Sequence, residues 1–332
     1  MSTSNKEFEQ GLAALVPRIV PGATRVESLR RLSAGATLQT WSFDAVGDGV
    51  RHPLILRRSP GGLRAAQTLT LEVEADLVRA LAGSGVPVAH VVHTLAPADG
   101  LGEGFFMTRI DGETIPRKIL RDAEFAALRP TLAASFCSIL GALHRVDVAT
   151  LPPLQVRSTS GLFEMMRQRY QTTLKPSAVL DYAFAWLADR MPPDPPGRHL
   201  VHGDFRHGNV IIGPEGVRAV LDWEIAHIGD PAEDLAWVCV PPWRFGELDL
   251  PVGGFGTREQ MFAAYEQATG QPVDVARVHW WEAMGSLRWA IGCAGMAEWF
   301  RSGRDPSVER AMIARRTSES EMDLMRILAG GH

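Results

Sequence analysis

The residues with the clearest chemical potential lie at positions 200–212, where the sequence reads LVHGDFRHGNVII. Five polar residues interrupt this otherwise apolar stretch: His202, Asp204, Arg206, His207 and Asn209. Histidine and aspartate can bind a metal ion, aspartate can act as a general base, and such groups can also simply stabilise a turn. The cluster therefore admits three interpretations, which are a metal site, a catalytic loop and a hydrogen-bonded turn.

The spacing of the oxygen-bearing side chains favours the catalytic loop. Four residues separate Asp204 from Asn209, and Asp222 closes the hairpin that we expect directly afterwards. A loop of this kind can direct a carboxylate at a substrate hydroxyl, while an amide oxygen and a second carboxylate bind a hard cation. Phosphoryl transfer needs these parts, because a magnesium-bound triphosphate must be neutralised and the acceptor held in line.

The elements around the loop divide into a sheet part and a helical part. Short apolar stretches with glycine-containing turns at 28–58 predict antiparallel strands, and 68–83 predicts a helix. Strand character returns at 85–95 and 104–110. From about residue 122 the spacing is helical, except for NVIIGPEGVRAVLDW at 209–223, which predicts a β-hairpin. The polar cluster therefore precedes a hairpin embedded in helices.

Two motifs together resemble those of the aminoglycoside phosphotransferase-like family, whose members share the two-lobed protein-kinase-like fold. They are HGDFRHGN and LDWEIAHIGDPAEDLAW. The resemblance implies an α+β fold, with a small antiparallel-sheet lobe carrying one key helix at 1–110 and a larger helical catalytic lobe at 111–332. It also implies that Asp204 is the catalytic base, that Asn209 and Asp222 bind Mg²⁺, and that His202 and Arg206 support the loop.

Two other interpretations of the cluster remain. In one, Asp204 caps a turn and Asn209 bonds the backbone. In the other, His202, Asp204 and His207 are ligands in a metal hydrolase, although no third motif with matching ligands is evident. Arg206 and His207 are equally compatible with a structural hydrogen-bonding role and with substrate contact. In GDPAEDLAW, Asp230 and Asp234 could bind a metal ion, but a carboxylate before an apolar helical stretch is usually a cap, and the resemblance implies that this segment supports the loop.

A nucleotide site of the kinase type requires a basic residue on a strand and a glutamate on the next helix. Arg57 ends the apolar strand PLILRR, where kinases usually have lysine. Glu74 falls on the apolar side of its predicted helix with Leu71 and Val78, so it needs a partner, and Arg57 is the natural candidate. Arginine also binds phosphate.

Two further segments are expected to contact the nucleotide, which would be ATP, with GTP as the alternative. Ser33, Gly35 and Thr37 lie where a phosphate-covering loop belongs, although an ordinary hairpin turn explains them as well. FFMTRIDG resembles the linker between the lobes, so the backbone from Thr108 to Ile110 would meet the adenine and Met107 would line its pocket. A core strand would account for the same side chains.

The acceptor is expected to be the hydroxyl of a small molecule. The candidate contacts are Arg206, Glu224, Trp243, Arg244, Trp281 and Arg288, although tryptophans at helical spacing are more often core. The segments after residue 240 carry several arginines and show no acidic cluster, which disfavours a polycationic aminoglycoside as the acceptor. LILRRSP, HGDFRHGN and DWEIAHIGDP resemble the kinase domain fused to acyl-CoA dehydrogenases in animals, which implies a hydroxyacyl-CoA acceptor. A nucleotide-binding module without transfer activity is a further alternative.

The overall composition fits a soluble enzyme of the cytoplasm. The chain has 332 residues, is 45% hydrophobic and carries a net charge of −4 without long charged runs, so we expect no nucleic-acid or membrane partner. Three distant cysteines indicate neither disulfides nor a cysteine zinc site. The start, MSTSNKEFEQ, lacks the pattern of a secretory signal. The sequence does not indicate the oligomeric state.

Overall fold

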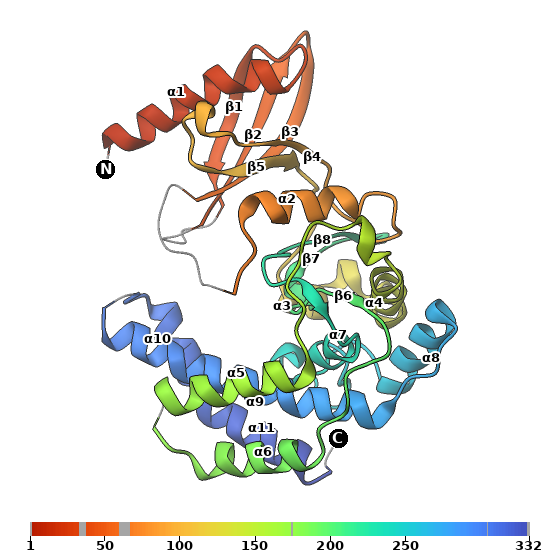
Figure 1. The fold of residues 1–332 in the computed structure, drawn as a ribbon. Helices are drawn as coiled ribbons and strands as arrows, with labels where there is room; N and C mark the ends of the chain where they lie inside the picture. The colour runs from red at the N-terminus through yellow and green to blue at the C-terminus, as the bar shows by residue number, and fades with distance from the viewer. Residues whose placement is uncertain (1, 33–37, 60–66, 174, 304, 331–332) are drawn as a thin grey trace. The chain divides into compact units, whose positions relative to one another are not determined.

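The computed structural model describes residues 2–32, 38–59, 67–173, 175–303 and 305–330 (Figure 1). The chain forms two compact units. The first contains residues 1–112, 149–153 and 218–226, and the second contains 113–148, 154–217 and 227–332. The fold is α+β, as predicted. Asp222 lies in the first unit, whereas Asp204 and the GDPAEDLAW segment lie in the second.

The first unit is built on a five-stranded antiparallel sheet with strand order β1-β2-β3-β5-β4. Its strands and its second helix have these bounds: β1 Arg25–Arg31, β2 Gln39–Gly47, β3 Val50–Ser59, α2 Leu71–Ala80, β4 Val91–Thr94 and β5 Glu103–Thr108. Thr70 caps α2 by accepting a hydrogen bond from the backbone N–H of Val73. The strands predicted at 28–58 and the helix predicted at 68–83 are thus confirmed, whereas residues 85–90 are not in a strand.

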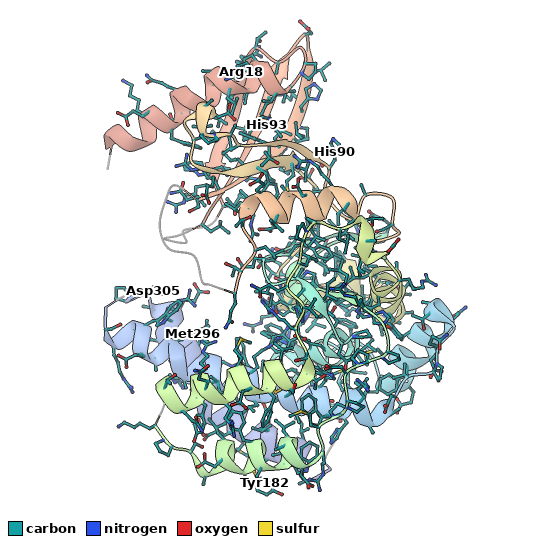
Figure 2. All side chains as sticks on the ribbon, in the orientation of Figure 1. Arg18, His90, His93, Tyr182, Met296 and Asp305 are labelled. Carbon is teal, nitrogen blue, oxygen red and sulfur yellow. The ribbon has the colours of Figure 1, made fainter. Side chains whose placement is uncertain are left out.

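Helix α1 (Ser2–Ile19) packs against this sheet and was not anticipated from the sequence (Figure 1). Phe8, Leu12 and Leu15 are buried in one apolar cluster with Phe43 and Leu56 of the sheet. Asp99 contacts the C-terminal end of α1. Its Oδ1 lies 3.6 Å from Arg18 Nη1, and its Oδ2 lies 3.0 Å from His93 Nε2. Figure 2 labels both of these basic side chains.

The second unit is mainly helical. Its helices are α3 Pro116–Arg121, α4 Arg129–His144, α5 Thr159–Thr173, α6 Ala178–Asp189, α7 Ala232–Trp237, α8 Arg258–Thr269, α9 Val275–Arg301, α10 Val308–Ala314 and α11 Thr317–Leu328. The 27-residue α9 contacts α5, α6, α7, α10 and α11, and its core side chains Trp280, Leu287 and Ile291 are buried (Figure 1). A helix that is apolar on several sides must be covered on several sides, which explains its central place.

Short strands frame the polar cluster. Strand β6 (His199–Val201) pairs with β9 (His227–Gly229), and β7 (Val210–Gly213) pairs with β8 (Gly216–Val220), as the predicted hairpin requires. The α9–α10 connection is fixed by Arg310, which donates hydrogen bonds to Asp305 and Met296, both labelled in Figure 2. None of the described helices combines the length and apolar character needed to cross a bilayer.

Candidate active site

Asp204 lies in the loop between β6 and a short 3-10 helix at His207–Asn209. Its Oδ1 accepts hydrogen bonds from Trp237 Nε1 at 2.6 Å and from Arg206 Nε at 3.1 Å. Its Oδ2 accepts one from Asn209 Nδ2, also at 2.6 Å. Because three donors from different residues hold it, the carboxylate has a fixed plane and retains one acceptor position on Oδ2.

Asn209 is oriented by the same loop. Its Nδ2 donates to the backbone oxygen of Asp204 at 2.9 Å as well as to the carboxylate, and its backbone N–H donates to the carbonyl of Arg206 at 2.8 Å. With the amide nitrogen engaged on this side, the amide oxygen is the atom left to bind an outside partner. An amide oxygen is a ligand that suits a hard cation such as Mg²⁺.

Asp234 of α7 holds the start of the loop in place. Its carboxylate is fully buried and accepts hydrogen bonds from the backbone N–H groups of His202 at 2.8 Å and Gly203 at 2.9 Å. His144 Nε2 lies 3.3 Å from Oδ2, the oxygen that also accepts from the N–H of His202. Burial alone would raise the pKa of Asp234, but these hydrogen bonds and the two histidines lower it. Gly203 has φ of +80°, a backbone conformation that suits glycine.

The two loop histidines are placed differently from metal ligands. His202 is buried, and its Nδ1 accepts a hydrogen bond from the backbone N–H of Asp204 at 3.1 Å. The ring of His207 packs edge-on against Phe245 and Phe255, with ring-centre distances of 5.3 and 5.8 Å. In the described residues, no group of three or more histidine, cysteine, aspartate and glutamate side chains could hold a metal ion.

For His207, the sequence left a structural hydrogen-bonding role and substrate contact equally open. Neither of its buried ring nitrogens has a hydrogen-bond partner among the described residues. Burial, and secondarily the charge of Arg206, lowers the pKa of His207 from 6.5 to about 3. The ring is therefore held neutral inside an aromatic pocket.

Replacing His207 by Phe is expected to remove part of the stability loss in mild acid. Since the pKa of His207 is lower in the folded than in the unfolded chain, the unfolded chain binds the proton first as pH falls below 6.5. At pH 5.5 this effect lowers the free energy of unfolding by about 1.4 kcal/mol relative to neutral pH. Urea unfolding of wild type and His207→Phe at pH 7.5 and 5.5 measures this loss. An equal loss of stability between the two pH values in both proteins would contradict an origin in His207.

In the first unit, Arg57 makes the predicted pair with Glu74. Arg57 Nε lies 3.4 Å from Glu74 Oε1, while Nη2 lies 2.6 Å from Asp222 Oδ1 and 3.5 Å from Glu224 Oε2. Burial disfavours the charged guanidinium, but the carboxylates of Glu74, Asp222 and Glu224 outweigh it and raise the pKa of Arg57. The guanidinium of Arg57 therefore stays charged, and its hydrogen bond orients the carboxylate of Asp222.

Asp222 has a backbone φ of +64°, in the left-handed region that non-glycine residues seldom occupy. Such strained residues gather at functional sites, where the surrounding contacts enforce them. The hydrogen bond from Arg57 engages one carboxylate oxygen, and the side chain is 35% exposed. Asp222 therefore offers a partly accessible carboxylate, a second hard ligand of the type that binds Mg²⁺.

The other predicted nucleotide residues are only partly described. Met107 and Thr108 end β5, where the backbone N–H of Thr108 donates to the carbonyl of His90. Ile110 follows in irregular backbone, and no hydrogen bond of its N–H is recorded among the described residues. Ser33, Gly35 and Thr37 lie outside the described residues.

Of the candidate acceptor contacts, Arg244 and Trp281 are buried and make hydrogen bonds inside the helical unit. Arg244 is 5% exposed, and its guanidinium donates to the carbonyl of Cys239 and to Glu282. Trp281 is 4% exposed and donates from Nε1 to Asp230 at 2.8 Å. These hydrogen bonds indicate structural roles for both side chains, and substrate contact by either one stays a prediction.

The remaining acceptor candidates divide between the units. Trp243 and Arg288 belong with Asp204 in the second unit, whereas Glu224 belongs with Arg57 in the first. The guanidinium of Arg206 stacks over the Trp243 ring at 4.5 Å, and that of Arg288 over the Trp237 ring at 3.7 Å. The sequence did not single out Trp237 as a site residue, although it ends the quoted motif GDPAEDLAW.

The phosphotransferase enzyme family model matches residues 28–290. Acyl-CoA dehydrogenase family member 10 of Mus musculus is 29% identical over 66% of this chain and 22% of its own length. Family member 11 of Gallus gallus is 28% identical over 75% of this chain and 33% of its own length. The chain thus spans between about a fifth and a third of the length of these relatives.

Solved structures of low identity share the fold. A candidate aminoglycoside phosphotransferase of Ralstonia eutropha has a TM-score of 0.75 and 22% identity, with 97% of this chain and 98% of that one covered. Aminoglycoside phosphotransferase APH(4)-Ia, in a ternary complex with AMP-PNP and hygromycin B, has a TM-score of 0.66 and 18% identity, with 97% and 98% covered. Since the family model covers well over half of its length, the chain belongs to the phosphotransferase enzyme family.

Proposed function

We propose that the protein transfers the γ-phosphoryl group of ATP to a hydroxyl of a small molecule, with Asp204 as the general base. The observation that carries the proposal is the carboxylate of Asp204, whose two oxygens are held by Trp237, Arg206 and Asn209. Oδ1 has both acceptor positions filled, so Oδ2 is the atom that would receive the hydroxyl proton. A base held in one plane needs no reorganisation when the acceptor binds.

The residues that would bind the nucleotide and its metal ion are those that the sequence motifs predict. Asn209 and Asp222 would supply oxygen ligands for Mg²⁺, an ion that would neutralise negative charge on the phosphates. Arg57 pairs with Asp222 and with Glu74, and its guanidinium would contact the phosphates. Met107, Thr108 and Ile110 would contact the adenine, and GTP is the alternative nucleotide.

The proposed acceptor is a hydroxyacyl-CoA. The names of the curated relatives support it, since both are acyl-CoA dehydrogenase family members. The charge beside Asp204 also suits an anionic acceptor, because Nη1 and Nη2 of Arg206 make no hydrogen bond among the described residues. An aminoglycoside acceptor is the alternative, supported by the hygromycin B bound to the APH(4)-Ia structure.

Phosphorus NMR with ATP and Mg²⁺ separates these acceptors. One set of reactions offers hydroxyacyl-CoA esters and the other offers aminoglycosides, and each is run with and without Mg²⁺. We expect a new phosphate ester signal only in the hydroxyacyl-CoA set. An ester only with aminoglycosides would reverse the acceptor assignment, and nucleotide binding without any ester would identify a binding module without transfer activity.

A further inference from the structure

We propose that Trp237 is a positioning residue for Asp204, held in place by Arg288 and Glu233. The proposal rests on the proposed function, because it assumes that Asp204 is the base. Trp237 Nε1 donates to Asp204 Oδ1 at 2.6 Å, the same distance as the Asn209 bond to Oδ2. The indole thus fixes the oxygen opposite the one that would take the proton.

The ring of Trp237 has little freedom to move. Trp237 is 6% exposed at the end of α7, where that helix approaches α9 closely. Gly285 of α9 permits the approach, since a Cβ added there would lie 3.2 Å from Trp237 Cε3. Trp243 packs against the ring at a centre distance of 5.4 Å. A donor held by packing on several sides directs its N–H along one line.

Arg288 connects this ring to the backbone of the catalytic loop. Its Cζ lies 3.7 Å above the centre of the Trp237 ring, and its Nη2 donates to the carbonyl of Gly203 at 2.8 Å. Gly203 directly precedes Asp204. One guanidinium therefore sets the position of the indole relative to the loop that carries the base.

Glu233 in turn holds Arg288. Glu233 Oε1 accepts from Arg288 Nη1 at 2.8 Å, and Oε2 lies 3.2 Å from His227 Nε2. The carboxylate is 4% exposed. Burial would raise the pKa of Glu233, but His227 and Arg288 lower it, which keeps the carboxylate ionised. Glu233, Arg288 and Trp237 thus form a continuous set of contacts that ends at Asp204.

Loss of the Trp237 hydrogen bond is expected to change the orientation of the Asp204 carboxylate and not the strength of substrate binding. Without the indole N–H, Oδ1 keeps only the longer bond from Arg206. The carboxylate, held otherwise by Asn209 on Oδ2, is then less restrained against rotation about its Cβ–Cγ bond. Rotation turns Oδ2 away from the acceptor hydroxyl, and small misplacements of this kind can cost about 100-fold in rate. Neither nucleotide nor acceptor loses a direct contact.

Trp237→Phe tests the proposal, because it keeps an aromatic ring for Arg288 and removes the N–H donor, together with part of the ring volume. The matched control is Trp280→Phe, which removes a similarly buried indole donor that bonds the carbonyl of Leu187 at 3.0 Å. We expect both variants to lower Tm by similar amounts. Only Trp237→Phe should lower kcat, by roughly 10- to 100-fold, with both KM values nearly unchanged.

Activity is measured with the acceptor that forms a phosphate ester, or as Mg²⁺-dependent ATP hydrolysis where none does. Equal kcat in Trp237→Phe and wild type, or an equal loss in both variants, would overturn the proposal. If Trp237→Phe does not fold, Glu233→Gln replaces it, and unchanged kcat there overturns the proposal too. Full activity of Asp204→Asn would instead show that the proposed function itself fails.

A measurement independent of turnover checks the contact directly. In a ¹H–¹⁵N spectrum, the Trp237 indole N–H, assigned by its absence in Trp237→Phe, should lie downfield because its acceptor is a nearby carboxylate. Asp204→Asn should shift this resonance and leave that of Trp280 in place. A Trp237 resonance that does not respond to Asp204→Asn would refute the positioning contact.

Discussion

Asp204→Asn is expected to lower kcat for phosphoryl transfer by about 10²- to 10⁴-fold, the usual contribution of a general base. The amide keeps the size of the side chain and can still accept from Trp237, but it cannot take up the acceptor proton. Steady-state ADP release at saturating ATP, Mg²⁺ and acceptor measures the change.

The control for this variant is Asp194→Asn, which alters a carboxylate that bonds the backbone N–H of Thr159 in the same unit. It should keep wild-type kcat. Asp204→Asn should also bind nucleotide with nearly unchanged Kd. A loss of less than about threefold in kcat would be inconsistent with general-base catalysis by Asp204.

Asp234→Asn is expected to lower the free energy of unfolding by about 3–5 kcal/mol, the range for removing one partner from a buried charged network. The carboxylate accepts hydrogen bonds from the N–H groups of His202 and Gly203 and lies 3.3 Å from His144 Nε2. An asparagine amide has one acceptor oxygen, so it can accept only some of these hydrogen bonds. Its own N–H groups would then point at other donors. Urea unfolding at pH 7.5 measures the loss.

The pH dependence of the same variant provides its control. The pKa of Asp234 is lowered in the folded protein from its ordinary value of 3.8, so its stabilisation is present above that value. It is lost as pH falls through the lower pKa of the folded state. The difference between wild type and Asp234→Asn should therefore shrink in strong acid, and a difference that grows there would contradict this account.

Local patterns predicted the parts of the site that depend on neighbouring residues. Glu74 shares a helix side with Leu71 and Val78, and this spacing alone required a buried partner such as Arg57. The turn chemistry at 213–216 likewise predicted the β7–β8 hairpin. In both cases the signal lies within a few residues, where periodicity and turn preferences operate.

Contacts between distant residues could not be predicted in this way. Arg244 was expected at the acceptor because it is basic, but its partner Glu282 lies 38 residues away on α9. Trp237 reaches Asp204 across 33 residues, since α7 packs beside the loop. Helix α1 was missed although Phe8, Leu12 and Leu15 have helical spacing. Its apolar face is stabilised by packing on the sheet, and this packing is not visible in the local sequence.

We propose that Asp204 acts as the base when a γ-phosphoryl group moves from ATP to an acceptor hydroxyl. The most direct test follows ATP labelled with ¹⁸O in the γ-phosphoryl group by phosphorus NMR, for wild type and Asp204→Asn in parallel. We predict that the wild type forms a labelled phosphate ester in the presence of Mg²⁺ and that the variant forms almost none. Equal rates of ester formation by the two proteins would contradict the claim.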